Sequence, residues 1–227
     1  LEKISNEKQK IITVEDPVEY QLDGITQIQA NASIGLGFAE GLRSIVRQDP
    51  DILMIGEIRD HETAEIAIES ALTGHLVFST LHTNDAAGAV TRLQDMGVEG
   101  YLISSSLLAI QAQRLVRRVC TECAETHPLS LDEARVLDID SAECAEIRRG
   151  KGCERCGQTG YRGRVGLYEL LLMSDEIRHQ IASGADANSI RDTAIKGGMR
   201  TLRQDALEKL RAGLTTPEEV VRVTRAV

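Results

Sequence analysis

The sequence has no tryptophan, and aromatic residues make up only 3% of its 227 residues. Proteins that hold single-stranded nucleic acid stack its bases on aromatic side chains, and this composition supplies no such platform. A formal net charge of −9 at pH 7 also opposes a general nucleic-acid binder, although Arg114, Arg117 and Arg118 form a local basic cluster. The sequence therefore predicts no nucleic-acid partner.

A membrane-spanning segment and a phosphate-binding loop are also missing. No apolar run is long enough to cross a bilayer and no secretory signal is visible, so we expect a cytoplasmic protein. No stretch matches G-x-x-x-x-G-K-[ST], the loop whose backbone amides cradle nucleotide phosphates, and residues 150–152 do not fit it. Because the chain begins at Leu1 and leaves too little room for this loop before Ile11, we expect a fragment of a longer protein.

Apolar runs alternate with helical patterns over the first half of the sequence, which predicts a parallel α/β sheet. The clearest strand lies within residues 51–57, where ILMI is typical of a strand buried on both faces. Residues 75–81 predict another buried strand, and Pro17 ends a first strand at 11–14. A further strand is expected at 25–29, and helices are expected at 37–48, 63–72, 86–96 and 100–113.

The second half of the sequence reads differently. Periodicity is weak between Cys120 and Cys156, where a short helix is expected within 131–147. Residues 164–172 predict a strand, and everything after Met173 is predicted to be helical. The expected helices are 175–183, 187–196, 201–211 and 217–225, with glycines at 197, 198 and 213 as stops.

Acidic residues follow two of the predicted strands. Glu57 ends the apolar run at 51–57, and Glu15 and Asp16 end the first strand. Ligands of open α/β sheets bind beyond the carboxyl ends of strands, where an acid can hold Mg²⁺ through water or orient an attacking water. Taken alone, Glu57 fits a solvated acid at a strand end equally well, but the second acid cluster at the same edge favours a catalytic function.

Two histidines bracket the predicted strand at 75–81. His82 follows its carboxyl end among serine and threonine, which favours a role in sensing phosphate, whereas a structural role is the better interpretation for His75. Arg43 and Arg47 lie a helical turn apart before the 51–57 strand. Arginines in such a place can neutralise charge in a phosphoryl-transfer transition state, but a solvated helix face explains the spacing equally well.

Four of the five cysteines form two C-x-x-C pairs, Cys120 with Cys123 and Cys153 with Cys156. About thirty residues separate the pairs, which is the spacing of a four-cysteine zinc site. Four thiolates leave no open coordination position, so a structural metal is expected rather than a catalytic one. Cys144 is the odd cysteine, and we expect it to be a free thiol.

Long segments of the sequence resemble the motifs of the type II/type IV secretion ATPases. Residues 12–20 (ITVEDPVEY) resemble their aspartate box, and residues 42–60 (LRSIVRQDPDILMIGEIRD) resemble their Walker B segment. Residues 73–84 (TGHLVFSTLHTN) resemble their histidine box. Residues 112–120 (AQRLVRRVC) lead into a tetracysteine segment that residues 160–169 (GYRGRVGLYE) close. The match runs nearly end to end and is most similar to the E-type ATPases of type II secretion.

The resemblance implies a RecA-like ATPase core at 1–116, a tetracysteine zinc-binding subdomain at 117–163 and a mainly helical subdomain at 164–227. It also assigns roles to single residues. Glu57 is implied as the Walker B acid and Glu15 and Asp16 as the aspartate-box acids, while His75 and His82 are the histidine-box residues. The implied zinc ligands are Cys120, Cys123, Cys153 and Cys156. Arginines that approach the nucleotide or a neighbouring subunit are Arg43, Arg47, Arg59 and Arg92.

The family further implies a homo-hexamer at the cytoplasmic face of the inner membrane. Such a hexamer would hydrolyse ATP with Mg²⁺ to drive pseudopilus assembly and protein export, and N-terminal domains absent from this sequence would meet the membrane platform. The family places the phosphate-binding loop upstream of Leu1, so we expect these 227 residues alone to hydrolyse ATP poorly.

Two alternatives to the secretion motor stay open. The closer one is a type IV pilus assembly ATPase; residues 198–207 and 215–220 lean toward secretion, and neighbouring genes would separate the two. The other is a non-enzymatic, zinc-dependent interaction module, which would be favoured if no phosphate-binding loop lay upstream. A zinc-ribbon nucleic-acid binder is disfavoured by the acidic composition.

Overall fold

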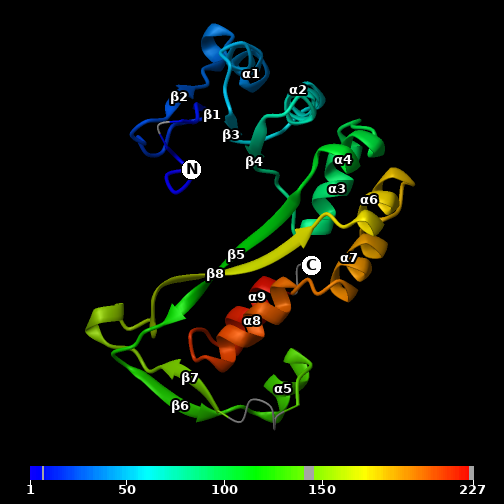
Figure 1. Cartoon of the computed structure of the whole chain (residues 1–227). Coiled ribbons are helices and arrows are strands. Elements are labelled where there is room, and N and C mark those ends of the chain that lie inside the picture. The colour runs from blue at the N-terminus through cyan, green and yellow to red at the C-terminus, as the bar shows by residue number, and fades with distance from the viewer. Residues whose placement is uncertain (7, 141–145, 225–227) are drawn as a thin grey trace. The chain divides into compact units, whose positions relative to one another are not determined.

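The computed structural model describes residues 1–6, 8–140 and 146–224 (Figure 1). The predicted free thiol, Cys144, lies outside these residues. The chain divides into two compact units. The first comprises Leu1–Thr83, Ala87–Leu108 and Met173–Ile190, and the second comprises Asn84–Ala86, Ala109–Leu172 and Arg191–Val227. The two units are defined by which residues pack together. They do not test the predicted division of the sequence into three parts, which stays a prediction.

The first unit contains a parallel sheet with the strand order β2-β1-β3-β4. Its strands are β1 (Ile11–Glu15), β2 (Thr26–Gln29), β3 (Ile52–Ile55) and β4 (Leu76–Ser79). In the register, Val14 pairs with Ile55, and Ile55 pairs with Ser79. The carboxyl ends of β1, β3 and β4 therefore meet at one edge of the sheet, and the predicted parallel α/β fold is confirmed.

Helices of the first unit begin within two residues of their predicted starts. They are α1 (Phe38–Val46), α2 (His61–Leu72), α3 (Ala86–Asp95), α4 (Gly100–Ser106) and α6 (Asp175–Ala182), of which α3 begins with a residue of the second unit. The Asp60 carboxylate accepts the N–H of Thr63 at 2.8 Å and so caps α2. A Cβ built at Gly41 would lie 3.0 Å from Val14 Cγ1, so a glycine lets α1 pack closely on β1.

The prediction that the strand at 75–81 is buried was wrong. Leu76 and Phe78 of β4 are 37% and 41% exposed, whereas three of the four β3 residues are buried. The reason is position in the sheet. Strand β3 lies between β1 and β4, but β4 pairs only with β3 among the described residues. An apolar run therefore predicted the strand correctly without predicting what covers it.

A long antiparallel ribbon forms the centre of the second unit. It pairs β5 (Ala109–Val119) with β8 (Tyr161–Leu172). The predicted helix at 100–113 was therefore wrong beyond Ser106, because α4 ends there and Leu107 already has extended backbone. Along β5, half-buried and exposed residues alternate from Ile110 to Leu115, which is the two-residue period of a strand. The strand predicted at 164–172 is confirmed and begins three residues earlier.

The segment between the two cysteine pairs contains more structure than the sequence predicted. A small antiparallel pair, β6 (Ala124–Pro128) and β7 (Glu146–Gly150), was missed. The short helix is α5 (Leu131–Leu137), which a capping box between Ser130 and Glu133 begins. Two short 3₁₀ turns, Ala32–Ile34 and Glu154–Cys156, complete the irregular parts of the fold.

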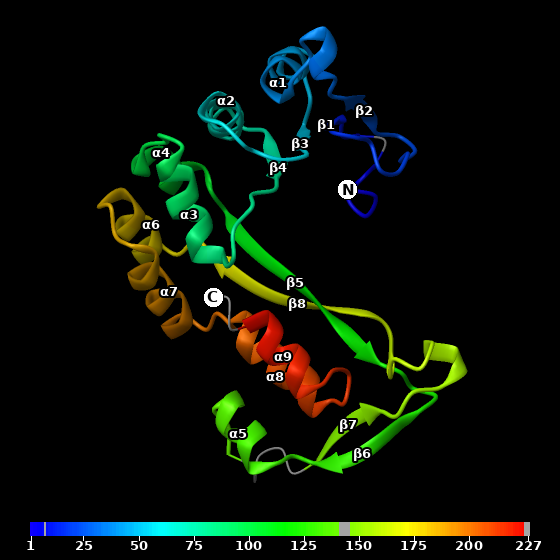
Figure 2. The ribbon, with the colours of Figure 1, turned by 180° about the vertical axis from the view of Figure 1, so that it is seen from behind.

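The C-terminal region is helical as predicted, with α7 (Ala187–Lys196), α8 (Leu202–Arg211) and α9 (Pro217–Thr224). Helices α8 and α9 lie side by side against the ribbon of β5 and β8 (Figure 2). Buried apolar side chains from all four elements form this core; they include Val116, Leu167, Ala206, Leu210 and Val220. Among the described helices, none combines the length and apolar character needed to cross a bilayer.

A buried glutamate connects α9 to the ribbon. The Glu219 side chain is 1% exposed, and it accepts the Arg117 backbone N–H at 2.7 Å and the Arg222 Nη2–H at 2.7 Å. Burial alone would raise the pKa of this carboxyl, but the hydrogen bonds from Arg222 and Arg117 outweigh it and lower the pKa to about 2. Arg117, part of the local basic cluster, therefore serves as a partner of Glu219.

We predict that Glu219→Gln lowers the free energy of unfolding by about 2 kcal/mol at pH 7 and by less at pH 3. The folded-state pKa is depressed, so the carboxylate stabilises the fold above its ordinary pKa. This contribution disappears as pH falls from about 5 to about 2. Urea denaturation at the two pH values measures the difference. Glu218→Gln, next in sequence but half-exposed, is the control and should cost under about 1 kcal/mol. Equal losses at both pH values would contradict the prediction.

Candidate functional sites

The first candidate site lies at the carboxyl ends of β1, β3 and β4. Gly56 follows β3, and its N–H donates to the Val14 carbonyl at 2.8 Å. A Cβ at Gly56 would stand 3.3 Å from that carbonyl oxygen and 3.3 Å from Phe38 Cε1. Because residue 56 is a glycine, the backbone after β3 can pass close to β1. Glu57 therefore lies at the carboxyl edge of the sheet, where Glu15 also lies.

Two basic side chains hold the Glu57 carboxylate. Arg59 Nη2 lies 2.5 Å from Oε1, and His82 Nε2 lies 2.9 Å from Oε2. The Glu57 side chain is 13% exposed, and the hydrogen bond from Arg59 lowers the pKa of its carboxyl despite burial, with help from His82. Glu57 is therefore an ionised acid at neutral pH, with each oxygen oriented by a separate residue.

The loop that carries His82 is tied to the loop that carries Glu57. Thr80 Oγ1 donates to the Gly56 carbonyl at 2.6 Å, and the Ile58 N–H donates to the Thr80 carbonyl at 3.0 Å. Both bonds lie beyond the last paired residues of β3 and β4. They hold the two loops together beyond the paired strands, next to Glu57 and His82.

The predicted aspartate-box acids lie at the end of β1. Glu15 Oε1 accepts from Thr13 Oγ1 at 2.6 Å and from Gln27 Nε2 at 2.9 Å. The pKa of Arg59 is raised chiefly by its hydrogen bond to Glu57, and the negative charge of Asp16 adds to the effect. Asp16 and Glu57 therefore act on the same guanidinium. The structure gathers Glu15, Asp16, Glu57 and His82 at one edge of the sheet.

His75 and three of the predicted arginines lie apart from Glu57. His75 precedes β4 at its amino end, where Nδ1 lies 2.8 Å from the Ser70 carbonyl at the close of α2. Arg43 pairs with Glu62 and lies 3.9 Å from Glu40. Arg47 caps the end of α1 and Arg92 lies in the last turn of α3, and both are exposed. The nucleotide roles of these four residues stay predictions, whereas Arg59 contacts Glu57 directly.

Sequence reasoning missed some partners of the acids. Thr80 was noted only as part of a polar cluster, and its position after an apolar run was the available signal. Gln27 reaches Glu15 from the neighbouring strand β2, and nothing in its local sequence marks it. Partners of this kind depend on strand pairing, which a single sequence does not display.

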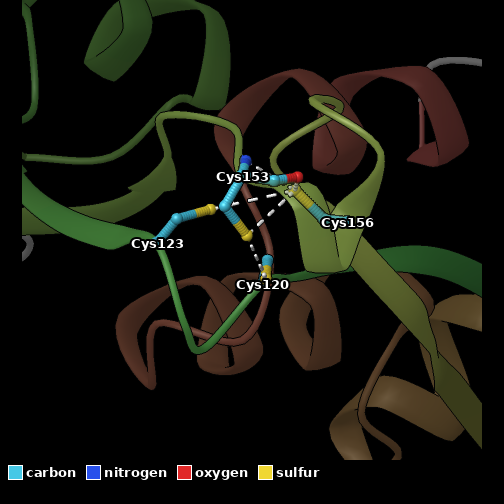
Figure 3. A group of neighbouring side chains, drawn as sticks. All are labelled: Cys120, Cys123, Cys153 and Cys156. Atoms are coloured by element: carbon cyan, nitrogen blue, oxygen red, sulfur yellow. Dashed lines mark hydrogen bonds between the residues drawn. The ribbon is translucent and has the colours of Figure 1, made fainter.

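The second candidate site consists of the four predicted cysteines. Figure 3 shows their side chains turned toward one another, and all four sulfurs lie within 4.8 Å of one another. The Sγ–Sγ distances are 3.9 Å for Cys120 and Cys153, 3.9 Å for Cys123 and Cys156, and 3.7 Å for Cys153 and Cys156. Thiolates at about 2.3 Å from a tetrahedral zinc stand about 3.8 Å apart, so the cluster fits a tetrahedral metal.

Close backbone contacts bring the second cysteine pair to the first. The Cys120 N–H donates to the Gly160 carbonyl at 2.9 Å. Gly160 has φ +78°, and a Cβ there would lie 2.4 Å from the Gly150 carbonyl oxygen, so only a glycine fits. This contact joins the end of β7 to the start of β8 beside Cys156.

Backbone N–H groups favour the thiolate form of one cysteine, Cys156. Burial raises the pKa of the Cys123 thiol to about 12. At Cys156 burial is outweighed by the N–H groups of Cys153 and Gly160, which lie 3.2 and 3.3 Å from Sγ and lower the pKa to about 6. A thiolate is the form that binds a metal, and a bound cation would displace the remaining thiol protons.

Comparison with known proteins now gives the class of the molecule. The first unit contains a parallel sheet with acids at its strand ends, and the second unit contains the four-cysteine cluster. Residues 1–222 match the family Type II/IV secretion system protein, and the chain belongs to this family. The family resemblance stated from the sequence is confirmed.

Curated relatives cover almost the whole chain. Type IV pilus assembly ATPase PilB of Thermus thermophilus is 52% identical over 223 residues, which are 97% of this chain and 25% of the relative. Type II secretion system ATPase E of Vibrio cholerae is 48% identical over 225 residues, 99% of this chain and 44% of the relative. Type II secretion system protein E of Pectobacterium carotovorum is 50% identical over 226 residues, 99% and 45%. The chain spans less than half the length of these relatives.

Solved structures share the fold. The pilus retraction motor PilT with bound ADP has a TM-score of 0.66 and 29% identity, and the match covers 95% of this chain and 52% of that one. The Legionella pneumophila ATPase DotB has a TM-score of 0.69 over 98% of this chain and 53% of that one. At 24% identity, the second likeness concerns the fold alone.

We predict that the purified chain binds about one zinc ion and that Cys156→Ser removes it, because three thiolates hold zinc more weakly than four. Elemental analysis after gel filtration measures the metal, and thermal unfolding with a chelator measures its contribution to stability. Cys144→Ser is the matched control, since the sequence gives Cys144 no paired cysteine, and it should keep the metal. Full metal retention by Cys156→Ser would refute the assignment.

Proposed function

We propose that this chain is the C-terminal part of a secretion ATPase that hydrolyses ATP to drive pseudopilus assembly and protein export. The observation that carries the proposal is the Glu57 carboxylate, ionised and held between Arg59 and His82 at the carboxyl edge of a parallel sheet. Nucleotides bind at this edge in open α/β sheets. The family membership of residues 1–222 supports the same function.

The chemistry we propose is phosphoryl transfer to water. Glu57 would orient the attacking water or hold it against Mg²⁺, and Glu15 and Asp16 would supply further negative charge for the Mg²⁺ shell. Arg59 and His82 would release Glu57 toward the nucleotide or stabilise the charge that develops on the transferred phosphoryl group. Arg43, Arg47 and Arg92 are proposed to approach nucleotide or a neighbouring subunit, and His75 is proposed as the second histidine of the box.

A phosphate-binding loop is the part of this proposal that residues 1–227 do not contain. We propose that a segment outside them supplies it in the longer protein, as the greater length of the relatives supports. One side of β4 pairs with no described strand, and it is a suitable place for a further strand. Its apolar residues Leu76 and Phe78 are partly exposed, and edge strands of this kind are normally covered.

The remaining features of the proposal concern assembly. The four cysteines would hold a structural Zn²⁺ that fixes the segment between β5 and β8. The whole protein would act as a homo-hexamer at the cytoplasmic face of the inner membrane, where domains outside this chain meet the secretion platform. These statements rest on membership of the family and on the cysteine geometry.

A type IV pilus assembly ATPase is the second candidate. The relative from the pilus system is 52% identical and those from type II secretion are 48% and 50% identical, so identity does not separate the two systems. A non-enzymatic zinc module is less well supported, because it gives no reason for two basic residues to orient Glu57. Genes next to the reading frame would distinguish export from pilus assembly.

We predict that Glu57→Gln lowers the ATP turnover number of the full-length protein by roughly 100-fold or more, because a neutral amide attracts Mg²⁺ less and orients the attacking water less well than a carboxylate does. Phosphate release measures turnover, and zinc content and hexamer size check the fold. Glu65→Gln, an exposed acid on α2, is the matched control and should keep the wild-type rate. Unchanged turnover in Glu57→Gln would refute the proposed function.

We predict that residues 1–227 alone release phosphate from ATP no faster than the buffer blank, since backbone amides of a phosphate loop are missing from them. A malachite-green assay on the purified chain measures this, with the full-length protein as the positive control. Robust turnover by the 227 residues would contradict the proposed supply of the loop from outside.

A further inference from the structure

The chain leaves the first compact unit for three residues directly after the His82 loop. Leu1–Thr83 and Ala87–Leu108 belong to the first unit, whereas Asn84–Ala86 belongs to the second. Residues 80–86, which we name the strap, therefore join both units by covalent bonds.

The near end of the strap is fixed to the candidate nucleotide site. Thr80 exchanges two hydrogen bonds with the loop after β3, and His82 Nε2 lies 2.9 Å from the Glu57 carboxylate. The position of His82 on Glu57 therefore depends on where its own backbone is held.

Residues of the second unit fix the far end of the strap in three places. Arg114 Nη2 donates to Asn84 Oδ1 at 2.7 Å. Arg191 forms an ion pair with Asp85, and Glu169 Oε1 accepts the Ala86 N–H at 2.9 Å. Thr83 alone separates the two anchored ends.

Glu169 is the most deeply placed of these anchors. It is 3% exposed, and its other oxygen accepts the Leu202 N–H at 3.1 Å. One buried carboxylate thus receives the first N–H of α3 and the first N–H of α8. Helix N-termini carry partial positive charge, which offsets the cost of burying this carboxylate between them. Its side chain belongs to neither the acid cluster nor the cysteine cluster.

We propose that Glu169 is a positioning residue for the proposed phosphoryl transfer: by anchoring the start of α3 it holds the strap, and the strap holds His82 against Glu57. The inference rests on the proposed function, since it assigns Glu169 an effect on the same site. It predicts that a residue without contact to nucleotide or acids changes the chemical step. An error of about 1 Å transmitted to His82 is enough to slow a reaction.

The test compares Glu169→Gln with Asp205→Asn in the full-length protein. Asp205 on α8 is also buried and accepts a backbone N–H, that of Tyr168 at 2.8 Å, but it has no described contact with the strap. Both substitutions replace a carboxylate by an amide in the same core, so both should lower the melting temperature. Glu169→Gln should also lower kcat by about 10- to 100-fold with KM for ATP within about twofold, whereas Asp205→Asn should keep kcat.

A double-mutant cycle with His82→Ala decides whether Glu169 acts through the histidine. If it does, Glu169→Gln should have little further effect on kcat once His82 is removed. Additive losses in kcat, or equal kcat losses in Glu169→Gln and Asp205→Asn at equal loss of stability, would overturn the inference. Glu57→Gln is measured alongside. If Glu57→Gln loses turnover while Glu169→Gln does not, the inference about Glu169 fails and the proposed function stands.

A second variant covers the case in which Glu169→Gln does not fold. Asn84 is exposed, so Asn84→Ala removes the shorter hydrogen bond from Arg114, the one to the Asn84 side chain, without opening the core. It should lower kcat several-fold at an unchanged melting temperature, and Arg118→Ala on the same strand as Arg114 is its control. An Asn84→Ala enzyme with wild-type kcat, beside an unfolded Glu169→Gln, would overturn the proposal.

Discussion

The parallel register of β1, β3 and β4 is the constraint on which the candidate nucleotide site depends. Because Val14 pairs with Ile55 and Ile55 with Ser79, the residues that follow each strand emerge in one row. Main-chain hydrogen bonds thus collect Glu57 and His82 from distant parts of the sequence. A slip of one residue along β3 would carry Glu57 away from His82, so the strand register that forms the sheet also fixes the site.

The sequence predicted an element correctly where its local pattern is compatible with only one secondary structure. The apolar run of β3 predicted a strand, and its carboxyl end then predicted a place for Glu57. Sequence reasoning failed for β5, because the sequence of residues 109–113 suits either a helix or a strand. Only their pairing with residues 168–172 of β8 makes them a strand. It also missed β6 and β7, which lie between the cysteine pairs, where a metal site can replace the large apolar core that gives other elements their periodicity. His75 and His82 share one motif, yet a strand lies between them and separates them to opposite ends of β4.

The four-cysteine cluster and the apolar core stabilise different parts of the second unit. Val116, Leu167 and the inner faces of α8 and α9 form a continuous core, while the cysteines form a separate buried cluster. The contact between Gly150 and Gly160 connects this cluster to the start of β8. Removal of the proposed metal should therefore loosen the segment between β5 and β8 first. The ribbon core should loosen only through the strand ends that this segment joins.

Two buried carboxylates fix how helix α8 is aligned with strand β8 in the second unit, which apolar packing alone does not fix. Glu169 on β8 accepts the N–H of Leu202 on α8, and Asp205 on α8 accepts the N–H of Tyr168 on β8. The two bonds are reciprocal, so they define one register of helix against strand, whereas apolar side chains tolerate small shifts. A buried charge left without its donor is costly, and an incorrect register would leave two of them. Glu169 differs from Asp205 in that its second oxygen accepts the N–H of Ala86, so of these two carboxylates only Glu169 has a described contact with the strap. Under the proposal, the position of His82 therefore depends on a buried carboxylate as well as on the exposed loop in which it lies.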